Sequence, residues 1–388
     1  MSEIITNRSI SSIENAVEYF NEVMRHHVER DILSAHRDVM AGKLRPYPVL
    51  RINHLIQPED TFEPEDEFQL PFIETSETPK GILMNEIVNM LTPLKLLNPV
   101  NACFGLGVGP GTLVACFDIP LNSQAQNSPS YHLSLDQLLL KPLPDPKTSG
   151  LMPRMHEKIE LIKNNVPDNF KINLPDLQGP FNLAHLILGT EVFMAPYADP
   201  AKFHAVMQKI TDFWMMARRV LIDWIGPERI SPWYWSDNIV CECSVNMISP
   251  EMYREFVLPY DRQIAEAIGS IAIHPCSGAH VFHATLNSLP NVVYTEAGYI
   301  ENSTAEVISV DDALEAIGDQ PIALGIGQEL PPGREYEFIR KDLERYLDNP
   351  RLIFEYTGMH WRKKDRPLIR DLHKRLDNYW EESVRTCF

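Results

Sequence analysis

The chain has 388 residues, of which 44% are hydrophobic and 23% are charged, and these values are typical of a globular protein. Its 35 Lys and Arg against 53 Asp and Glu give a formal net charge of −18, which disfavours binding to nucleic acid or to an anionic membrane. No apolar run approaches the roughly 18 residues that a membrane-spanning helix needs, and the N-terminus lacks the apolar core of a signal peptide. We therefore expect a cytoplasmic protein that acts on a small molecule.

Apolar side chains at helical spacing predict that residues 1–42 are helical, and Pro46 and Pro48 end this stretch. Strand and helix patterns then alternate toward the C-terminus. The predicted strands are 49–55, 102–106, 170–174, 230–235, 270–274, 292–296, 322–326 and 352–356. The clearest predicted helices are 200–225, 250–268, 311–317, 335–347 and 364–382.

Eight short apolar strands joined by helices favour a parallel α/β fold, and eight is the strand number of a closed (β/α)₈ barrel. An open doubly wound sheet is the alternative. Its nucleotide-binding fingerprint is not matched, because Pro110 interrupts the glycine run at 105–111 and no acidic residue ends a following strand. We predict a (β/α)₈ TIM barrel over residues 46–388, preceded by an N-terminal helical extension over residues 1–45.

The chemistry of such a barrel takes place at the C-terminal ends of its strands. We predict that two carboxylates there, Asp237 and Glu296, are catalytic. Trp235 could form an aromatic wall beside Asp237, or it could belong to ordinary strand packing. The predicted substrate-binding residues at these strand ends are His54, Gln178, Trp235, Gln328 and Tyr356.

A His-x-Cys pair ends the predicted strand at 270–274. His274 and Cys276 are two residues apart on extended chain, so both side chains can point into the same barrel mouth. An imidazole nitrogen and a thiolate suit Zn²⁺, which could keep a substrate thiol as thiolate. Glu296 and His360 are candidates for further ligands. The same spacing also arises by chance, and these two residues could instead be a helix-capping acid and a surface histidine.

Three motifs then resemble the uroporphyrinogen decarboxylase superfamily. The segment 176–189 (DLQGPFNLAHLILG), followed by Tyr197-Ala-Asp-Pro200, is similar to the G-P-[FW]-T-L-A…G…D-P segment of that superfamily. The segment 248–260 (ISPEMYREFVLPY) resembles its S-P-x-x-[FY]-x-x-F-x-x-P-Y helix start. The segment 274–278 (HPCSG) is similar to the H-x-C-G region of its cobamide-dependent methyltransferase branch. The resemblance covers residues 100–380 and also implies a (β/α)₈ barrel.

Porphyrinogen decarboxylation is not the expected reaction. The decarboxylases carry an Arg-rich segment, R-Q-A-G-R-Y, that binds the carboxylates of the substrate, whereas this chain reads Tyr47-Pro-Val-Leu50 after Arg45-Pro46. Their active-site Tyr corresponds to Leu186 here. A net charge of −18 also suits an octa-anionic substrate poorly.

The methyltransferase branch implies Zn²⁺ held by His-x-Cys and a later Cys. His274 and Cys276 match the first two ligands, but Met359 stands in place of the later Cys, and a thioether is a poor ligand for Zn²⁺. His360 could substitute for it. The predicted metal ligands are therefore His274, Cys276 and His360, with Glu296 as a fourth ligand or a base.

We expect a methyltransferase that moves a methyl group between a corrinoid-bound donor, carried by a partner protein, and a small acceptor, a thiol activated by zinc. Asp237, Gln178 and Glu296 would orient the acceptor and manage protons. Two alternatives stay open. One is a metal-independent decarboxylase or other lyase for a small non-porphyrin acid, and the other is a non-catalytic barrel that binds a corrinoid protein through the acidic loop at 59–67.

Overall fold

A computed structural model gives the fold of the protein. It describes residues 9–26, 49–55, 72–73, 78–92, 100, 102–106, 109–122, 128–231, 239–275, 279–297, 308–320, 322–326, 335–346, 349, 352–360 and 371. The acidic loop at 59–67 lies outside these residues. None of the described helices is both long enough and apolar enough to cross a membrane.

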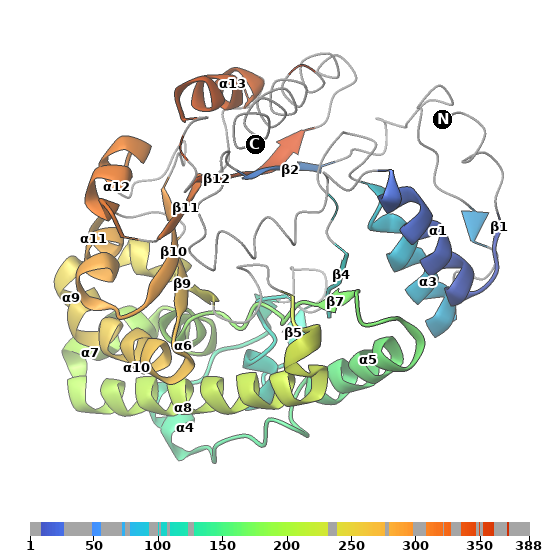
Figure 1. The fold of residues 1–388 in the computed structure, drawn as a ribbon. Helices are drawn as coiled ribbons and strands as arrows, with labels where there is room; N and C mark the ends of the chain where they lie inside the picture. Colours follow the sequence, from blue (N-terminus) through green and yellow to red (C-terminus); the bar gives the residue numbers. More distant parts are fainter. Residues whose placement is uncertain are drawn as a thin grey trace.

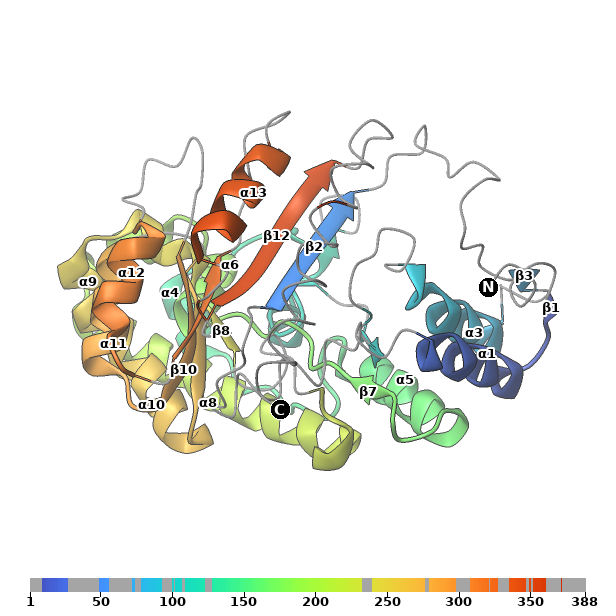
Figure 2. The ribbon, with the colours of Figure 1, turned by 45° about the horizontal axis from the view of Figure 1, so that its top comes forward.

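Six parallel strands form the main sheet, in the spatial order β2, β12, β11, β10, β9, β8 (Figure 1). β2, the first of them along the chain, pairs with β12, the last, and the two lie side by side in Figure 2. This pairing brings distant parts of the chain together, as a barrel requires. The six strands are β2 (Val49–Leu55), β8 (Ile239–Cys241), β9 (Ile271–His274), β10 (Val292–Ala297), β11 (Ala323–Ile326) and β12 (Leu352–His360).

Two further strands, β4 (Cys103–Phe104) and β7 (Lys171–Ile172), form a separate parallel pair. The chain after β7 approaches the main sheet at β8, where the Gly179 N–H donates to the Cys241 carbonyl at 2.7 Å. The parallel α/β class is therefore confirmed. Closure of the eight strands into a barrel is not, because within the described residues no strand ladder joins β4 to β2 or β7 to β8.

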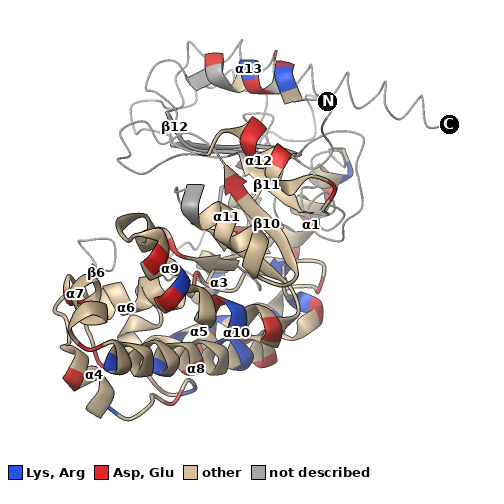
Figure 3. Ribbon diagram, turned by 90° about the vertical axis from the view of Figure 1, so that its left-hand side faces the viewer, with Lys and Arg blue, Asp and Glu red and all other residues tan. Residues whose placement is uncertain are grey.

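Helices surround the strands on the outside (Figure 1). The longest, α8, has 26 residues; its N-cap is Asp199, whose carboxylate accepts from the Lys202 N–H at 3.1 Å, and Gly226, with φ of 88°, follows its last residue. Acidic and basic residues are interleaved along α8 and α10 (Figure 3). The helices are α1 (Ile13–Arg25), α3 (Pro79–Asn89), α4 (Leu135–Leu140), α5 (Met152–Asn165), α6 (Pro180–Leu188), α7 (Glu191–Ala198), α8 (Pro200–Ile225), α9 (Pro250–Phe256), α10 (Leu258–Ile268), α11 (Ala279–Ser288), α12 (Val310–Ile317) and α13 (Glu335–Tyr346).

One predicted strand is only partly described, and one strand was not predicted. Of the strand expected at 230–235, the structure describes residues 230 and 231, and Ile230 makes an isolated parallel bridge to Ile172, whereas β8 lies further along the chain, where no strand was expected. The aromatic run Trp233-Tyr-Trp235 has high strand propensity, and the three residues of β8 are too few to show a period-2 pattern. The other predicted strands overlap β2, β4, β7, β9, β10, β11 and β12.

One predicted helix is divided. The stretch 250–268 forms α9 and α10, with a break at Val257, whose φ of −118° departs from the roughly −63° of a regular α-helix. Pro259 explains the break, because proline has no N–H for a continuous helix but is tolerated in the first turn of a new one. The prediction for 200–225 is confirmed by α8. The predicted helix at 364–382 lies outside the described residues, apart from residue 371.

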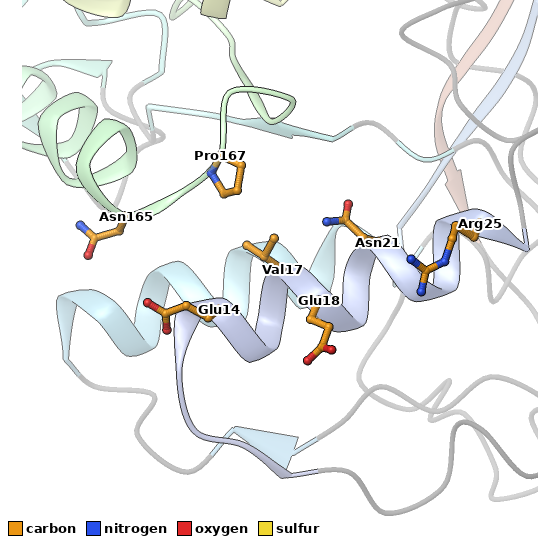
Figure 4. A pocket seen from close by; sticks show the side chains of 7 residues that line it. All are labelled: Glu14, Val17, Glu18, Asn21, Arg25, Asn165 and Pro167. Carbon is orange, nitrogen blue, oxygen red and sulfur yellow. The ribbon is translucent and has the colours of Figure 1, made fainter.

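The N-terminal helix packs against the rest of the chain. Of the predicted helical stretch 1–42, the structure shows α1, whose Phe20 ring lies 4.8 Å from the ring of Phe170, just before β7. A groove of about 430 Å³ runs between α1 and the segment 165–167 (Figure 4). Because this segment precedes β7, the groove lies toward the N-terminal ends of the strands, away from the ends where chemistry is expected.

The strands β8 to β11 have two distinct faces. On the outer face, Val240, Ile271 and Ile273 belong to the apolar core beneath the helices. Side chains alternate along a strand, so Ala272, His274 and their register partners point to the inner face. The inner residues are Ile239 and Cys241 on β8, Ala272 and His274 on β9, Tyr294 and Glu296 on β10, and Ala323 and Gly325 on β11.

A buried carboxylate fixes the start of α6 against β8. Glu242, directly after β8, accepts from the N–H groups of Phe181 at 3.0 Å and Asn182 at 2.9 Å. Its carboxylate caps the N-terminus of α6, because the N-cap residue Gly179 has no side chain that could do so. A Cβ at Gly179 would lie 2.2 Å from the Glu242 Oε1 atom, so the glycine allows this close approach.

Glu242 lies beside a second fully buried carboxyl, Asp261 on α10, and the two interact electrostatically. Burial raises the pKa of Asp261 from its ordinary 3.8 to about 7. Burial and the charge of Asp261 also raise the pKa of Glu242 well above its ordinary value. The hydroxyl of Tyr253 on α9 donates to Asp261 Oδ2 at 3.4 Å. The pair therefore retains a proton that the same groups lose in the unfolded chain.

This proton makes the stability of the fold depend on pH. The unfolded chain releases this proton near pH 4, whereas the folded pair holds it up to about pH 7, so the free energy of unfolding should fall by roughly 2 to 4 kcal/mol across that range. Asp261→Asn removes one of the two ionisable groups of the pair and should reduce this fall, as measured by urea unfolding from pH 5 to pH 8. Asp223→Asn, at an exposed position on α8, should leave it unchanged. An Asp261→Asn protein as pH-sensitive as the wild type would contradict this assignment.

Candidate functional site at the C-terminal ends of the strands

The centre of the candidate site is a hydrogen-bonded pair of side chains on neighbouring strands. His274 is the last residue of β9, and its Nδ1 atom lies 2.5 Å from Oε2 of Glu296 on β10. The Glu296 side chain is 7% exposed and that of His274 is 19% exposed. The imidazole is therefore the member of the pair nearer the solvent, at the C-terminal end of its strand, where substrates of parallel α/β proteins bind.

Tyr294 completes a series of three side chains. It lies two residues before Glu296 on the same face of β10, and its hydroxyl donates to Glu296 Oε1 at 3.0 Å. Burial, followed by the neighbouring Glu296 carboxylate, raises the pKa of Tyr294 well above its ordinary value. The phenol consequently keeps its proton at neutral pH. Both oxygens of Glu296 are thus engaged, one with Tyr294 and one with His274.

Small residues make room for this series. Gly325 on β11 is the register partner of Glu296, and a Cβ placed there would lie 1.9 Å from the Tyr294 hydroxyl oxygen. Ala272 and Ala323 are the register partners of Tyr294 on its two sides. The tyrosine side chain, 1% exposed, therefore occupies space that larger neighbours would fill.

A second polar network follows β7. Gln178, in the left-handed region with φ of 58°, donates from its backbone N–H to Asp176 Oδ1 at 2.8 Å and from its side-chain amide to the other Asp176 oxygen. Asn182 on α6 donates to the Gln178 side-chain oxygen. The Trp214 indole N–H donates to the Gln178 carbonyl at 2.8 Å. Gln178 thus holds the half-buried Asp176 carboxylate in place beside the strand ends.

This network extends to a histidine. Asn182 Oδ1 accepts from the Ser244 backbone N–H at 2.9 Å and from the Ser244 hydroxyl, which lies 2.8 Å from Nδ1 of His185. Burial, followed by the charge of His132, lowers the pKa of His185. His185 is therefore neutral at pH 7, and the network connects α6 to the turn after β8.

The structure brings together some of the predicted residues. His274 and Glu296 are in direct contact, and Gln178 is buried in the network after β7. Asp237, Trp235, Cys276 and Gln328 lie outside the described residues. The side chains of His54, Tyr356 and His360 also lie outside the described part, although the backbones of β2 and β12 place His54 opposite Met359 and His360 opposite Leu55. The roles assigned to all of these residues stay predictions.

The structure describes only some of the predicted metal ligands. The described residues contain no group of three or more His, Cys, Asp or Glu side chains arranged to hold a metal ion. Of the predicted ligands, the side chain of His274 is described, and those of Cys276 and His360 are not. Zinc therefore stays a prediction for this site.

Sequence reasoning missed Tyr294, Asp176, Glu242 and Asp261. One signal was available for Tyr294, because it stands two residues before Glu296 on a predicted strand and so shares its face. Asp176 opens the Asp-Leu-Gln-Gly-Pro motif, but its carboxylate is held by a left-handed turn that no local pattern indicates. Glu242 and Asp261 meet across two elements, and their sequence separation conceals the contact.

Comparison with known proteins places the chain in a family. The family profile of uroporphyrinogen decarboxylase (URO-D) matches residues 123–316, half of the chain. A methyltransferase from Methanosarcina mazei has a similar fold, with a TM-score of 0.61 and 14% sequence identity over 90% of this chain and 99% of that chain. A comparison with curated protein sequences gives no match. The His274–Glu296 pair thus lies within the matched region, and the chain belongs to the uroporphyrinogen decarboxylase family.

Proposed function

We propose that this protein is a methyltransferase that moves a methyl group between a corrinoid-bound donor and a small acceptor, a thiol. The observation that carries the proposal is the contact between His274 and Glu296 at the C-terminal ends of β9 and β10. Support also comes from the fold that the chain shares with a methyltransferase from Methanosarcina mazei. In this proposal a partner protein presents the donor at this end of the fold.

His274 fits the chemistry of a zinc ligand. A histidine that binds zinc through one ring nitrogen typically donates the N–H of the other to a carboxylate, and Glu296 is such a carboxylate. Cys276 and His360 would complete the set of protein ligands. When bound, zinc would lower the pKa of the acceptor thiol and hold it as thiolate. Glu296, with both oxygens occupied, supports His274 better than it would serve as a fourth ligand.

The proposed transfer is a nucleophilic displacement. The acceptor thiol releases its proton, its sulfur forms a bond to the methyl carbon, and the carbon–cobalt bond breaks with its electron pair remaining on cobalt. The chain would orient the acceptor and accept the thiol proton, with Asp237 as the proposed proton acceptor. The residues proposed to surround the acceptor are His54, Gln178, Trp235, Gln328 and Tyr356.

The metal content of the purified protein tests the zinc assignment. We expect about one zinc per chain in the wild type and loss of the metal in His274→Ala and in Cys276→Ala, because each variant removes a ligand. Cys116→Ala is the matched control: Cys116 is a buried cysteine on the 3₁₀ helix Val114–Phe117, and its loss should leave the zinc in place. A wild-type protein without bound metal after zinc loading would contradict the zinc site.

Activity with methylcobalamin and a panel of small thiols tests the reaction itself. We expect methyl transfer that a chelator abolishes and that zinc restores, and Glu296→Gln should lower the rate by about 10- to 100-fold through weaker support of His274.

The competing functions give different results in the same assays. A metal-free protein as active as the zinc-loaded one would exclude the proposed mechanism. Release of CO₂ from a small carboxylic acid, unaffected by the chelator, would identify a lyase instead. Tight binding of a corrinoid protein without any turnover would identify a non-catalytic barrel.

A further inference from the structure

Tyr294 is a buried, hydrogen-bonded residue to which the proposed reaction assigns no role. Its side chain is 1% exposed and is placed among glycine and alanine neighbours on the inner face of the sheet. Its hydroxyl contacts the carboxylate that in turn contacts His274. A phenylalanine would fill the same space, so packing alone does not explain the hydroxyl.

The hydroxyl restricts the orientation of the Glu296 carboxylate. Oε1 accepts from Tyr294 at 3.0 Å, so a rotation of the carboxylate that withdrew Oε2 from His274 would also break the bond to the phenol. A carboxylate held at both oxygens presents one fixed acceptor to the imidazole. The ring nitrogen facing this acceptor must then carry the proton, because a carboxylate accepts hydrogen bonds and does not donate them.

We propose that Tyr294 is a positioning residue that acts through Glu296 to hold His274 as the tautomer with the proton on Nδ1. The lone pair of the neutral ring is then on Nε2, which is the atom that would bind the metal or meet the substrate. The identity of that ligand rests on the proposed function, whereas the tautomer does not.

Gly325 is the second part of the same arrangement. A Cβ at this position would lie 1.9 Å from the Tyr294 hydroxyl oxygen, so any other residue would displace the hydroxyl from Glu296. Gly325 itself touches neither Glu296 nor His274 through a side chain. Replacing it therefore breaks the tyrosine contact without altering any of the three interacting residues.

The tautomer of His274 can be read directly by NMR. In protein labelled with ¹⁵N-histidine, two-bond proton–nitrogen correlations distinguish a protonated Nδ1 from a protonated Nε2, and His274→Ala identifies the signals of this ring. We expect the Nδ1-protonated form in the wild type and a mixture of the two forms in Tyr294→Phe. The matched control is Tyr253→Phe, which removes another buried hydroxyl that contacts a carboxylate and should leave the His274 signals unchanged.

Gly325→Ala provides an independent route to the same result. It should also give the mixture of tautomers, provided that its circular dichroism and unfolding transition match those of the wild type. If Gly325→Ala fails to fold, Tyr294→Phe decides alone. A wild-type His274 with the proton on Nε2, or a Tyr294→Phe protein with the wild-type tautomer, would overturn the proposal.

Zinc affinity, measured by competition with a chromophoric chelator, separates this proposal from the proposed function. Tyr294→Phe should weaken zinc binding by about 10-fold or more, within the range found for partners of metal ligands, and Tyr253→Phe should not. If the wild type binds no zinc, the proposed function fails while the NMR result still decides the role of Tyr294. If zinc binds equally well to the wild type and to Tyr294→Phe, the positioning role is excluded and the proposed function stands.

Discussion

The site depends on the register of the parallel strands β8 to β11. This register places Cys241 beside His274 and Glu296 beside Gly325, with the side chains of Cys241, His274 and Glu296 on the inner face. Successive side chains along a strand point to opposite faces, so a slip of β9 by one residue would turn His274 toward the helices and bring Ile273 inward. The apolar residues of the outer face, such as Ile273, prevent such a slip because it would move them out of the core. Hydrophobic burial on one face thereby fixes the polar contacts on the other.

Two buried glutamates, Glu242 and Glu296, have different roles because their side chains point in different directions. Glu242 faces the helices, where two N–H groups of α6 and the carboxyl of Asp261 surround it. Glu296 faces inward, where it meets Tyr294 and the partly exposed His274. Glu242 fixes the start of α6, and burial suppresses its charge. Glu296 keeps a hydrogen-bond acceptor next to the His274 ring, which solvent can reach. A reactive or metal-binding histidine needs this arrangement.

Much of this could be predicted from the sequence, and the failures have physical causes. Short apolar runs located most strands, and the C-terminal strand ends indicated His274 and Glu296. β8 was not predicted because its three residues carry too little periodicity to be recognised as a strand. The contact between Tyr294 and Gly325 and that between Glu242 and Asp261 could not be predicted, because each depends on the register or packing of two separate elements. Local patterns determine which residues face inward but not which of them touch.

The substitution at position 359 changes the electrostatics of the proposed metal site. Two thiolates and one imidazole would neutralise Zn²⁺, whereas one thiolate and two imidazoles, from Cys276, His274 and His360, would leave a net positive charge. A more positive metal lowers the pKa of a bound acceptor further, but it also makes the resulting thiolate less nucleophilic. Glu296 moderates this effect, because a carboxylate bonded to the Nδ1 atom of His274 donates electron density to the ring. The Tyr294–Glu296–His274 series would then matter more here than in a site with two cysteine ligands, since its carboxylate contacts the proposed ligand His274 directly.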